Sequence, residues 1–233
     1  GRMDSAAAAL ELLLCEDPEE AEAIVAGLEA QNAARQKAEQ DILQGVLDSV
    51  AADETYGADR ILVVWGRGYH QGVIGIVASR VVERFGKPAI IVSVDENGEG
   101  KGSGRSIAGV SLYNAIAACG DLLIRFGGHA LAAGLSVREE NLPAFRKAVA
   151  QGHPVLKRPA LRLDAPLALS GLKEEDVAAL SVLAPFGHGN PTPVFFVENA
   201  VIDAVYPLSE GKHTRLRLKQ GGGVLYAAGF GQG

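Results

Sequence analysis

Apolar residues recur at helical spacing through the first fifty residues of the chain. Residues 4–15 predict a short helix with Leu10, Leu13 and Leu14 as its buried stripe. A much longer helical pattern follows over residues 19–51, and its middle third is mostly polar. A helix with so little apolar surface usually spans between domains instead of lying flat on one core.

Beyond this helix the pattern changes to short apolar runs that alternate with helical periods. Residues 61–65 and 89–94 are continuous apolar runs of strand length, and residues 72–85 between them have helical spacing. Strand, helix and strand at this spacing predict a βαβ unit with parallel strands. Two further helices are expected at residues 111–119 and 142–149, and a short strand at residues 135–137.

The pattern changes again after residues 151–160, which hold two prolines and a basic pair and predict a domain boundary. A single helix is expected near residues 173–183. The remaining sequence predicts strands at residues 161–169, 193–205, 213–219 and 223–230. The fold class is therefore an α/β domain, preceded by a long connecting helix and followed by a β-rich domain, either a small barrel or an open sheet.

Composition and charge narrow the classes of function. The chain has 233 residues, 48% of them hydrophobic, and no apolar run approaches the length of a membrane span, so no membrane partner is expected. The net charge of −6 means that a contact with nucleic acid must be local. Cys15 and Cys119 are predicted to be buried free thiols in a reducing cytoplasm, where we expect the protein to be located.

Three glycine-rich segments carry candidate chemistry, at residues 70–78, 100–106 and 127–134. Each combines a flexible backbone with side chains that can donate hydrogen bonds to phosphate. Residues 100–106 and 127–134 together suggest an anion clamp of two loops, and residues 70–78 are a further candidate anion site. Each also has a purely structural reading. Residues 100–106 could be a solvated hairpin loop, His129 could be held within a turn, and His70 could cap a turn whose glycines only permit close packing.

Catalytic motifs are absent from the sequence, which has no Asp-His-His grouping, no nucleophile elbow and no Walker-type loop. No catalytic residue and no metal ligand is therefore predicted in this chain. A strand with basic residues at every second position could follow single-stranded nucleic acid or could be a solvated face. The residues of this predicted basic face are His213, Arg215, Arg217 and Lys219.

Five motifs in a fixed order resemble one known family. They are residues 70–75, 100–106, 127–130, 133–134 and 185–191. In this order the motifs are similar to the C-terminal half of the RecJ exonucleases, which belong to the DHH phosphoesterase superfamily. The resemblance implies three parts: an exit from a missing DHH domain with the long connecting helix, a DHHA1 nucleic-acid-binding domain, and a truncated OB-like domain. Their expected limits are residues 1–56, 57–150 and 160–233.

The same resemblance implies a function for the parent protein. It would be a single-stranded-DNA-specific 5′→3′ exonuclease of DNA repair and recombination, with Mn²⁺ or Mg²⁺ bound in the missing DHH domain. This chain would grip the substrate and would be inactive alone. Single-stranded DNA is the expected partner, with a single-strand-binding protein or a helicase as candidate protein partners.

Site residues are carried over by the resemblance or suggested by the glycine-rich segments. The candidate nucleic-acid-binding residues are Ser103, Arg105, Ser106, Gly127, Gly128, His129, His70, Gln71, Lys101 and Arg2. Two alternatives stay open: a non-catalytic module that binds single-stranded nucleic acid, and a DHH–DHHA1 phosphodiesterase acting on oligonucleotides or cyclic dinucleotides. The β-rich segment after residue 160 argues against the second alternative.

Overall fold

The computed structural model describes residues 3, 5–151, 161–187 and 189–233 of the chain. It divides into two compact units, Gly1–Pro159 and Ala160–Gly233, which are described separately below. Within the described residues, no helix has both the length and the apolar character needed to cross a membrane.

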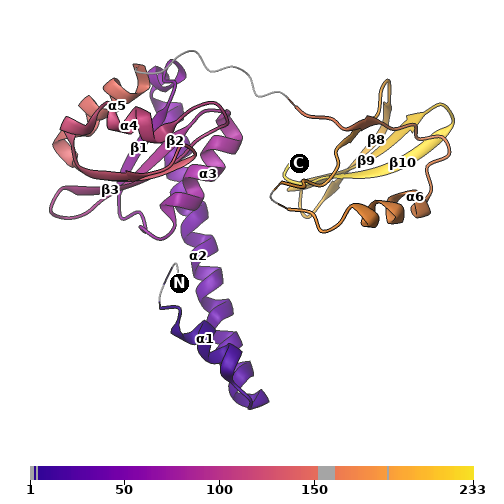
Figure 1. Ribbon diagram of the computed structural model, residues 1–233, viewed down its shortest axis with the longest axis horizontal. Helices are drawn as coiled ribbons and strands as arrows, with labels where there is room; N and C mark the ends of the chain where they lie inside the picture. Colours follow the sequence, from indigo (N-terminus) through magenta and orange to yellow (C-terminus); the bar gives the residue numbers. More distant parts are fainter. Residues whose placement is uncertain (1–2, 4, 152–160, 188) are drawn as a thin grey trace. The chain divides into compact units, whose positions relative to one another are not determined.

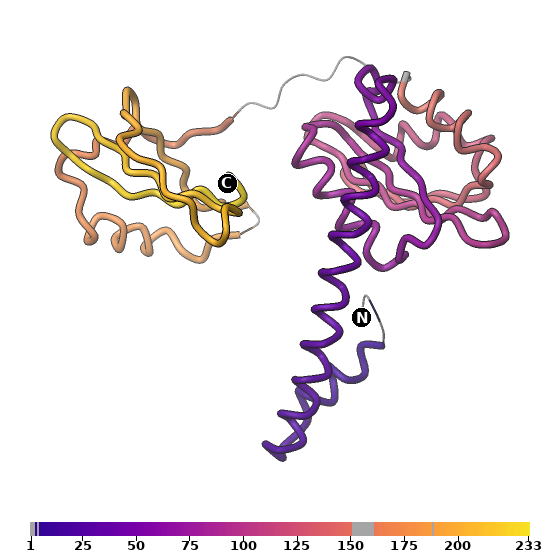
Figure 2. The backbone as a smooth tube through the Cα atoms, turned by 180° about the vertical axis from the view of Figure 1, so that it is seen from behind, coloured from indigo at the N-terminus to yellow at the C-terminus, as the bar shows by residue number. Residues whose placement is uncertain are grey.

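The first unit begins with two helices, α1 (Ala7–Leu14) and α2 (Pro18–Ala52), joined by a tight turn. The carboxylate of Asp17 accepts a hydrogen bond from the backbone N–H of Glu19 at 2.9 Å, and Pro18 occupies the first helical position. This cap fixes the start of α2. The long helix predicted from the sequence is confirmed, and Figures 1 and 2 show it continuing well past the edge of the sheet.

The expected buried stripe of α1 is wrong. Leu10, Leu13 and Leu14 are 59%, 82% and 72% exposed. The less exposed residues of α1 lie on another side, at Ala8 and Leu12. Because α1 is apolar on nearly every side, its sequence does not determine which side packs against α2.

The first unit is built around one five-stranded sheet with the order β1-β2-β3-β5-β4. The parallel pair β1 and β2 confirms the predicted βαβ unit, and the other neighbours are antiparallel. The strands are β1 (Leu62–Arg67), β2 (Ala89–Val94), β3 (Glu99–Arg105), β4 (Leu123–Gly128) and β5 (Ala132–Arg138).

Helices cover both faces of this sheet, and each face has its own hydrophobic core (Figure 1). Residues of α3 (Ile74–Phe85) and the C-terminal half of α2 form one core, in which Ile42 and Val46 of α2 are buried. Residues of α4 (Leu112–Ala117) and α5 (Leu142–Gln151) form the core on the opposite face. The long helix α2 is therefore anchored by its C-terminal part.

Residues 100–106 are not a loop, as the sequence suggested, but form most of β3 inside the sheet. A Cβ atom at Gly102 would lie 2.9 Å from Leu135 Cδ1, and one at Gly104 would lie 2.5 Å from Leu112 Cδ2. The glycines are therefore packing positions, where large apolar neighbours fill the space above the strand. The strand β4, which lies beside β5 at the edge of the sheet, was not predicted from the sequence either.

The second unit contains a three-stranded antiparallel sheet in the order β10-β9-β8. Its strands are β8 (Val201–Leu208), β9 (His213–Gln220) and β10 (Gly223–Gly229). A short parallel pair, β6 (Ala165–Pro166) with β7 (Phe195–Phe196), and helix α6 (Glu174–Ala179) complete it.

Two of the four strands expected in this unit are only partly correct. The strand predicted at residues 161–169 is reduced to the two residues of β6. The one at 193–205 is divided into β7 and β8, with Asn199 at a φ of 52° between them. A left-handed residue cannot continue a strand, so the chain turns there. The strands at 213–219 and 223–230 and the helix near 173–183 are confirmed.

Both cysteines are free, as predicted, but only one is buried. Cys119 is 9% exposed and follows α4, and desolvation raises the pKa of its thiol above the ordinary value. Cys15 is half-buried at the end of α1, and its thiol donates to the backbone oxygen of Asp17 at 3.2 Å.

Candidate nucleic-acid interface

The alternating sequence of β3 gives its two faces opposite characters. Its glycines lie on the side of α4, whereas Lys101, Ser103 and Arg105 lie on the side of α3, since successive residues of a strand point to opposite faces. At Gly75, in the first turn of α3, a Cβ atom would lie 3.0 Å from both Arg105 Nη2 and Ser103 Oγ. Glycine at this position lets the helix approach the two polar side chains closely.

The strand register extends this polar face across β5 and β4. Ser103 lies opposite Gly134, which lies opposite Gly127, so two neighbouring positions have no side chain. In the next row, Lys101 lies opposite Ser136, which lies opposite Arg125. We call this surface the glycine-floored face. Its residues are Lys101, Ser103, Arg105, Arg125, Gly127, Ala132, Gly134 and Ser136.

The two arginines of the glycine-floored face make hydrogen bonds to neutral oxygen atoms. Arg105 Nη1 donates to Ser103 Oγ at 3.2 Å and to the carbonyl oxygen of Gly104 at 2.8 Å. Arg125 Nε donates to Ser136 Oγ at 3.3 Å. Because these acceptors carry no charge, the positive charge of the face is available to an anion.

The hairpin between β4 and β5 places His129 beside the end of β3. The backbone N–H of His129 donates to the carbonyl oxygen of Ala132 at 2.7 Å, and its side chain is exposed. The backbone N–H of Ser106 donates to the carbonyl oxygen of Leu131 at 2.9 Å, which fastens the hairpin to β3. The structure thus brings parts of all three glycine-rich segments together, since Gly75 of the segment 70–78 packs against Ser103 and Arg105. The Ser106 hydroxyl is already used, since it donates to the carbonyl oxygen of Val110 at 2.8 Å.

The two glycines before His129 serve different purposes. Gly128 has a φ of 140°, and a Cβ atom there would lie 2.6 Å from Ala133 Cα. Gly128 is therefore required by the backbone. A Cβ atom at Gly127 would meet no atom within 4 Å. The absence of a side chain at Gly127 instead keeps the surface open.

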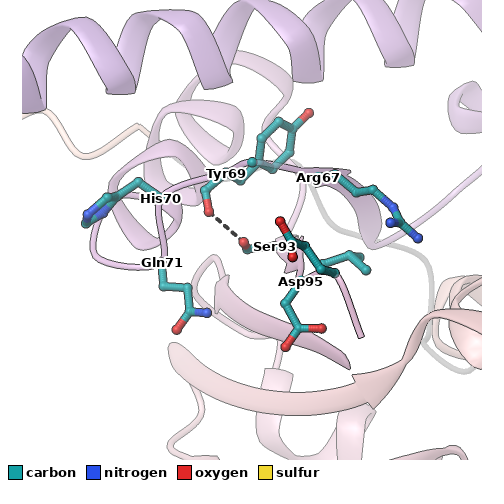
Figure 3. A pocket seen from close by; sticks show the side chains of 9 residues that line it. Arg67, Tyr69, His70, Gln71, Ser93 and Asp95 are labelled. Atoms are coloured by element: carbon teal, nitrogen blue, oxygen red, sulfur yellow. Dashed lines mark hydrogen bonds between the residues drawn. The ribbon is translucent and has the colours of Figure 1, made fainter. Parts of the chain in front are cut away.

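The beginning of the segment 70–78, by contrast, lies around a separate pocket. His70 and Gln71 follow β1 and line a pocket of about 830 Å³ together with Ser93 and Asp95 (Figure 3). His70 Nδ1 accepts a hydrogen bond from the backbone N–H of Gly72 at 3.1 Å, so His70 caps the turn that leads into α3. This is the structural reading considered above.

The groups around this pocket are poorly suited to an anion. The carboxylate of Asp95 accepts from the backbone N–H groups of Asn97 and Glu99, both at 2.9 Å. Glu96 adds a second acid to the lining, and Arg67 is paired with Glu139 at 2.6 Å. In Figure 3 the side chains of Arg67 and His70 extend in opposite directions, so the pocket does not focus positive charge at one point.

The predicted basic face of the second unit exists but is largely occupied by internal contacts. Asp203 on β8 pairs with Arg217 at 2.7 Å and with Lys219 at 2.6 Å, and the hydrogen bond from Lys219 is the main reason that the pKa of Asp203 is lowered. Arg215 lies 4.5 Å from the ring centroid of Tyr226. His213 Nδ1 accepts from a backbone N–H in the turn after β10.

Two further candidate arginines are placed by either the sequence or the structure, but not by both. Arg2 lies outside the described residues. Arg125 was missed by the sequence analysis, because its strand was not predicted. The part of the chain that the structure describes contains no group of three His, Cys, Asp or Glu side chains that could hold a metal ion.

Comparison with known proteins identifies both units. Residues 58–152 match the DHHA1 domain family, and residues 163–233 match the RecJ OB domain family. The single-stranded-DNA-specific exonuclease RecJ of Bacillus subtilis is 34% identical over 241 aligned residues, which cover 100% of this chain and 30% of that protein. RecJ of Thermus thermophilus is 38% identical, with 94% of this chain and 31% of that protein covered.

A solved structure supports the same assignment. The crystal structure of RecJ from Thermus thermophilus in complex with Mn²⁺ matches with a TM-score of 0.81 at 34% identity, covering 100% of this chain and 34% of that one. The chain spans about a third of the length of the curated relatives it matches. The fold class inferred from the sequence, a long helix, an α/β domain and a β-rich OB domain, is confirmed.

Proposed function

Because this chain is a RecJ homologue with a DHHA1 domain and a RecJ OB domain, we propose that it forms the substrate-binding part of a single-stranded-DNA-specific exonuclease. The parent protein would degrade DNA from the 5′ end in DNA repair and recombination in the cytoplasm. Its Mn²⁺ or Mg²⁺ ions would be held by residues outside this chain. In this proposal residues 1–56 connect, 57–150 hold the strand and 160–233 form the OB-like part.

The observation that carries the proposal is the glycine-floored face. It combines the guanidinium of Arg105, the hydroxyl of Ser103 and the bare backbone at Gly127 and Gly134 on one side of a rigid sheet. A phosphate group can approach such a backbone closely and receive charge-assisted hydrogen bonds from the arginine. His129, in the hairpin beside the end of β3, has an exposed side chain that can add a donor.

A local site of this kind also agrees with the charge of the chain. The net charge is −6, so a polyanion is repelled by most of the surface and is attracted only where basic groups lack acidic neighbours. Binding through phosphates alone carries no sequence information, which suits an enzyme that must process any strand.

The first test is a titration of a fluorescent 5′-phosphorylated single strand with the chain and with Arg105→Ala, each at two salt concentrations. We expect salt-sensitive binding that weakens about tenfold in the variant, as expected for loss of one charge-assisted phosphate contact. No binding by the unmodified chain, or equal binding by both proteins, would refute the proposed role of this face. A duplex of the same sequence should bind more weakly.

The same samples test the enzymatic part of the proposal. With Mn²⁺ or Mg²⁺ added, we expect the chain to bind the strand without shortening it. The match of residues 163–233 to the RecJ OB domain favours the exonuclease over a phosphodiesterase of small nucleotides. Hydrolysis of the strand by the purified chain would show that this division of roles is wrong.

A further inference from the structure

We propose that Lys101, Ser136 and Arg125 form a second phosphate-binding subsite on the glycine-floored face, next to the one at Ser103 and Arg105. The inference rests on the proposed function, since it adds a defined position for the strand to the same face. It assigns a role to Arg125, which belongs to none of the glycine-rich segments.

The three side chains occupy one row across three strands. Lys101 of β3 lies opposite Ser136 of β5, which lies opposite Arg125 of β4. Together with Gly127 and Gly134 they line a shallow hollow of about 380 Å³. Lys101 and Arg125 therefore lie on either side of Ser136, next to the two glycine positions that have no side chain.

The hydrogen bonding of the row leaves it ready for a ligand. Ser136 is only 2% exposed, and its hydroxyl receives the Nε–H of Arg125 at 3.3 Å. This bond orients the guanidinium and uses one of its donors, while those on the terminal nitrogens remain for an anion. The Lys101 side chain is exposed. The subsite thus has a fixed donor on one side and an adaptable one on the other.

The electrostatic surroundings favour an anion at this row. On one side lies the row of Ser103, Gly134 and Gly127, which has no acid. On the other side Glu99 lies opposite Arg138, and the carboxylate of Asp95, just after β2, accepts two backbone N–H groups. A phosphate group at Lys101 and Arg125 would therefore meet two positive charges, and Ser136, which lies opposite both of them, carries no charge.

The spacing of the rows matches a chain of phosphates. Two residues along a strand correspond to about 6.7 Å, which is comparable to one nucleotide of an extended single strand. A strand that follows β3 would place one phosphate near Ser103 and Arg105 and its neighbour between Lys101 and Arg125. The positions without side chains, Gly127 and Gly134, would leave room for the sugar between the two phosphates.

The test compares Lys101→Gln and Arg125→Gln with Arg84→Gln, which removes the same charge from an exposed position in the last turn of α3. Binding of a 5′-phosphorylated thymidine oligonucleotide is measured at several salt concentrations. We expect a three- to tenfold loss for each subsite variant and a decrease in the salt slope of about 0.7 for each lost contact. The Arg84→Gln variant should bind like the unmodified chain.

A second set of oligonucleotides locates the contact, each with one uncharged methylphosphonate in place of a phosphate. At one linkage the loss from the methylphosphonate and the loss from Arg125→Gln should not add, because both remove the same interaction. For Arg105→Ala the non-additive linkage should be the adjacent one. If both subsite variants bind as well as the unmodified chain while Arg105→Ala binds more weakly, the subsite is overturned but the proposed function is not. If the unmodified chain does not bind, the proposed function is overturned as well.

Circular dichroism and thermal melting of each variant establish that it is folded. Both substituted side chains lie at the surface, so the melting temperature should change little. Additive losses at every methylphosphonate position would contradict a defined subsite, since they would show only a general contribution of charge.

Discussion

Two strands of this chain, β3 and β9, carry basic residues on one face, yet they form different surfaces. On β3 and its neighbours, Arg105 and Arg125 bond to neutral oxygen atoms, and the residues opposite them, Ala132 and Ser136, carry no charge. On β9, Arg217 and Lys219 both pair with Asp203 of the neighbouring strand. The difference teaches that a basic strand becomes a basic surface only where its cross-strand neighbours carry no acid.

The two units also differ in how firmly they hold such a surface. The sheet of the first unit lies between two hydrophobic cores. In the second unit, among the residues that the structure describes, Leu169 is the only one that is buried. The glycine-floored face is thus preorganised by packing on the opposite side of its strands, and the face on β9 has much less support.

The largest effect should come from Gly128→Ala, which breaks the frame of the glycine-floored face. The new Cβ would meet the backbone at Ala133 in a conformation with positive φ, so we expect a loss of about 2–4 kcal/mol in the free energy of unfolding. Chemical denaturation measures it. The matched control is Gly127→Ala, whose Cβ meets no atom within 4 Å and which should change stability by less than about 1 kcal/mol. Equal stability of the two variants would contradict the different roles of these glycines.

The Asp203→Asn variant should reduce the contrast between the two basic strands. Without the carboxylate, Arg217 and Lys219 lose their internal partner, and we expect the affinity for a single strand to rise about two- to fivefold with a steeper salt dependence. Glu175→Gln on α6 makes the same change in net charge and serves as the control. A gain of equal size in both variants would mean that only total charge matters.

A smaller effect is expected around Arg146, a cation of the first unit whose guanidinium is engaged in contacts within the fold. It pairs with Asp53 and Asp59 at 2.8 and 2.7 Å and lies 3.4 Å from the ring centroid of Tyr56. Hydrogen bonds from the Thr55 hydroxyl and then from Arg146 lower the pKa of Asp53 from 3.8 to about 2.

Since the pKa is lower in the folded state, Asp53 stabilises the fold above about pH 4, and this contribution is lost as the pH falls towards 2. Unfolding experiments between pH 5 and pH 2 should show a weaker pH dependence for Asp53→Asn, with unchanged binding of DNA at pH 7. An identical pH dependence in both proteins would show that Asp53 has no such role.

The helix α3 and the parallel strands β1 and β2 could be predicted from the sequence because their apolar patterns are strong. The strand β3 could not, since its glycines and polar residues are typical of a loop. It forms a strand because Leu112 and Leu135 occupy the space that side chains at Gly104 and Gly102 would need. Such a tertiary contact leaves no local signal in the strand itself.

For the candidate site, the glycine-rich motifs indicated Ser103, Arg105 and His129, which the structure brings to one end of the sheet. The motif at His70 was equally prominent, but His70 and Gln71 line a different pocket, and only Gly75 of this motif reaches Ser103 and Arg105. Arg125 could not be found from the sequence, because its position becomes meaningful only once β4 is paired with β5. The motif residues and the grouping of residues 100–106 with 127–134 were thus predictable, whereas the position of Arg125 was not.

The central claim is that the glycine-floored face, more than the basic face of β9, holds the strand. The most direct test compares two triple variants that lose the same amount of positive charge. One replaces Lys101, Arg105 and Arg125 with Gln. The other replaces Arg215, Arg217 and Lys219 with Gln. Salt-dependent binding of a 5′-phosphorylated single strand is measured for both. We predict that the first variant loses most of the affinity and about two units of the salt slope, and that the second loses little. The reverse order would contradict the account.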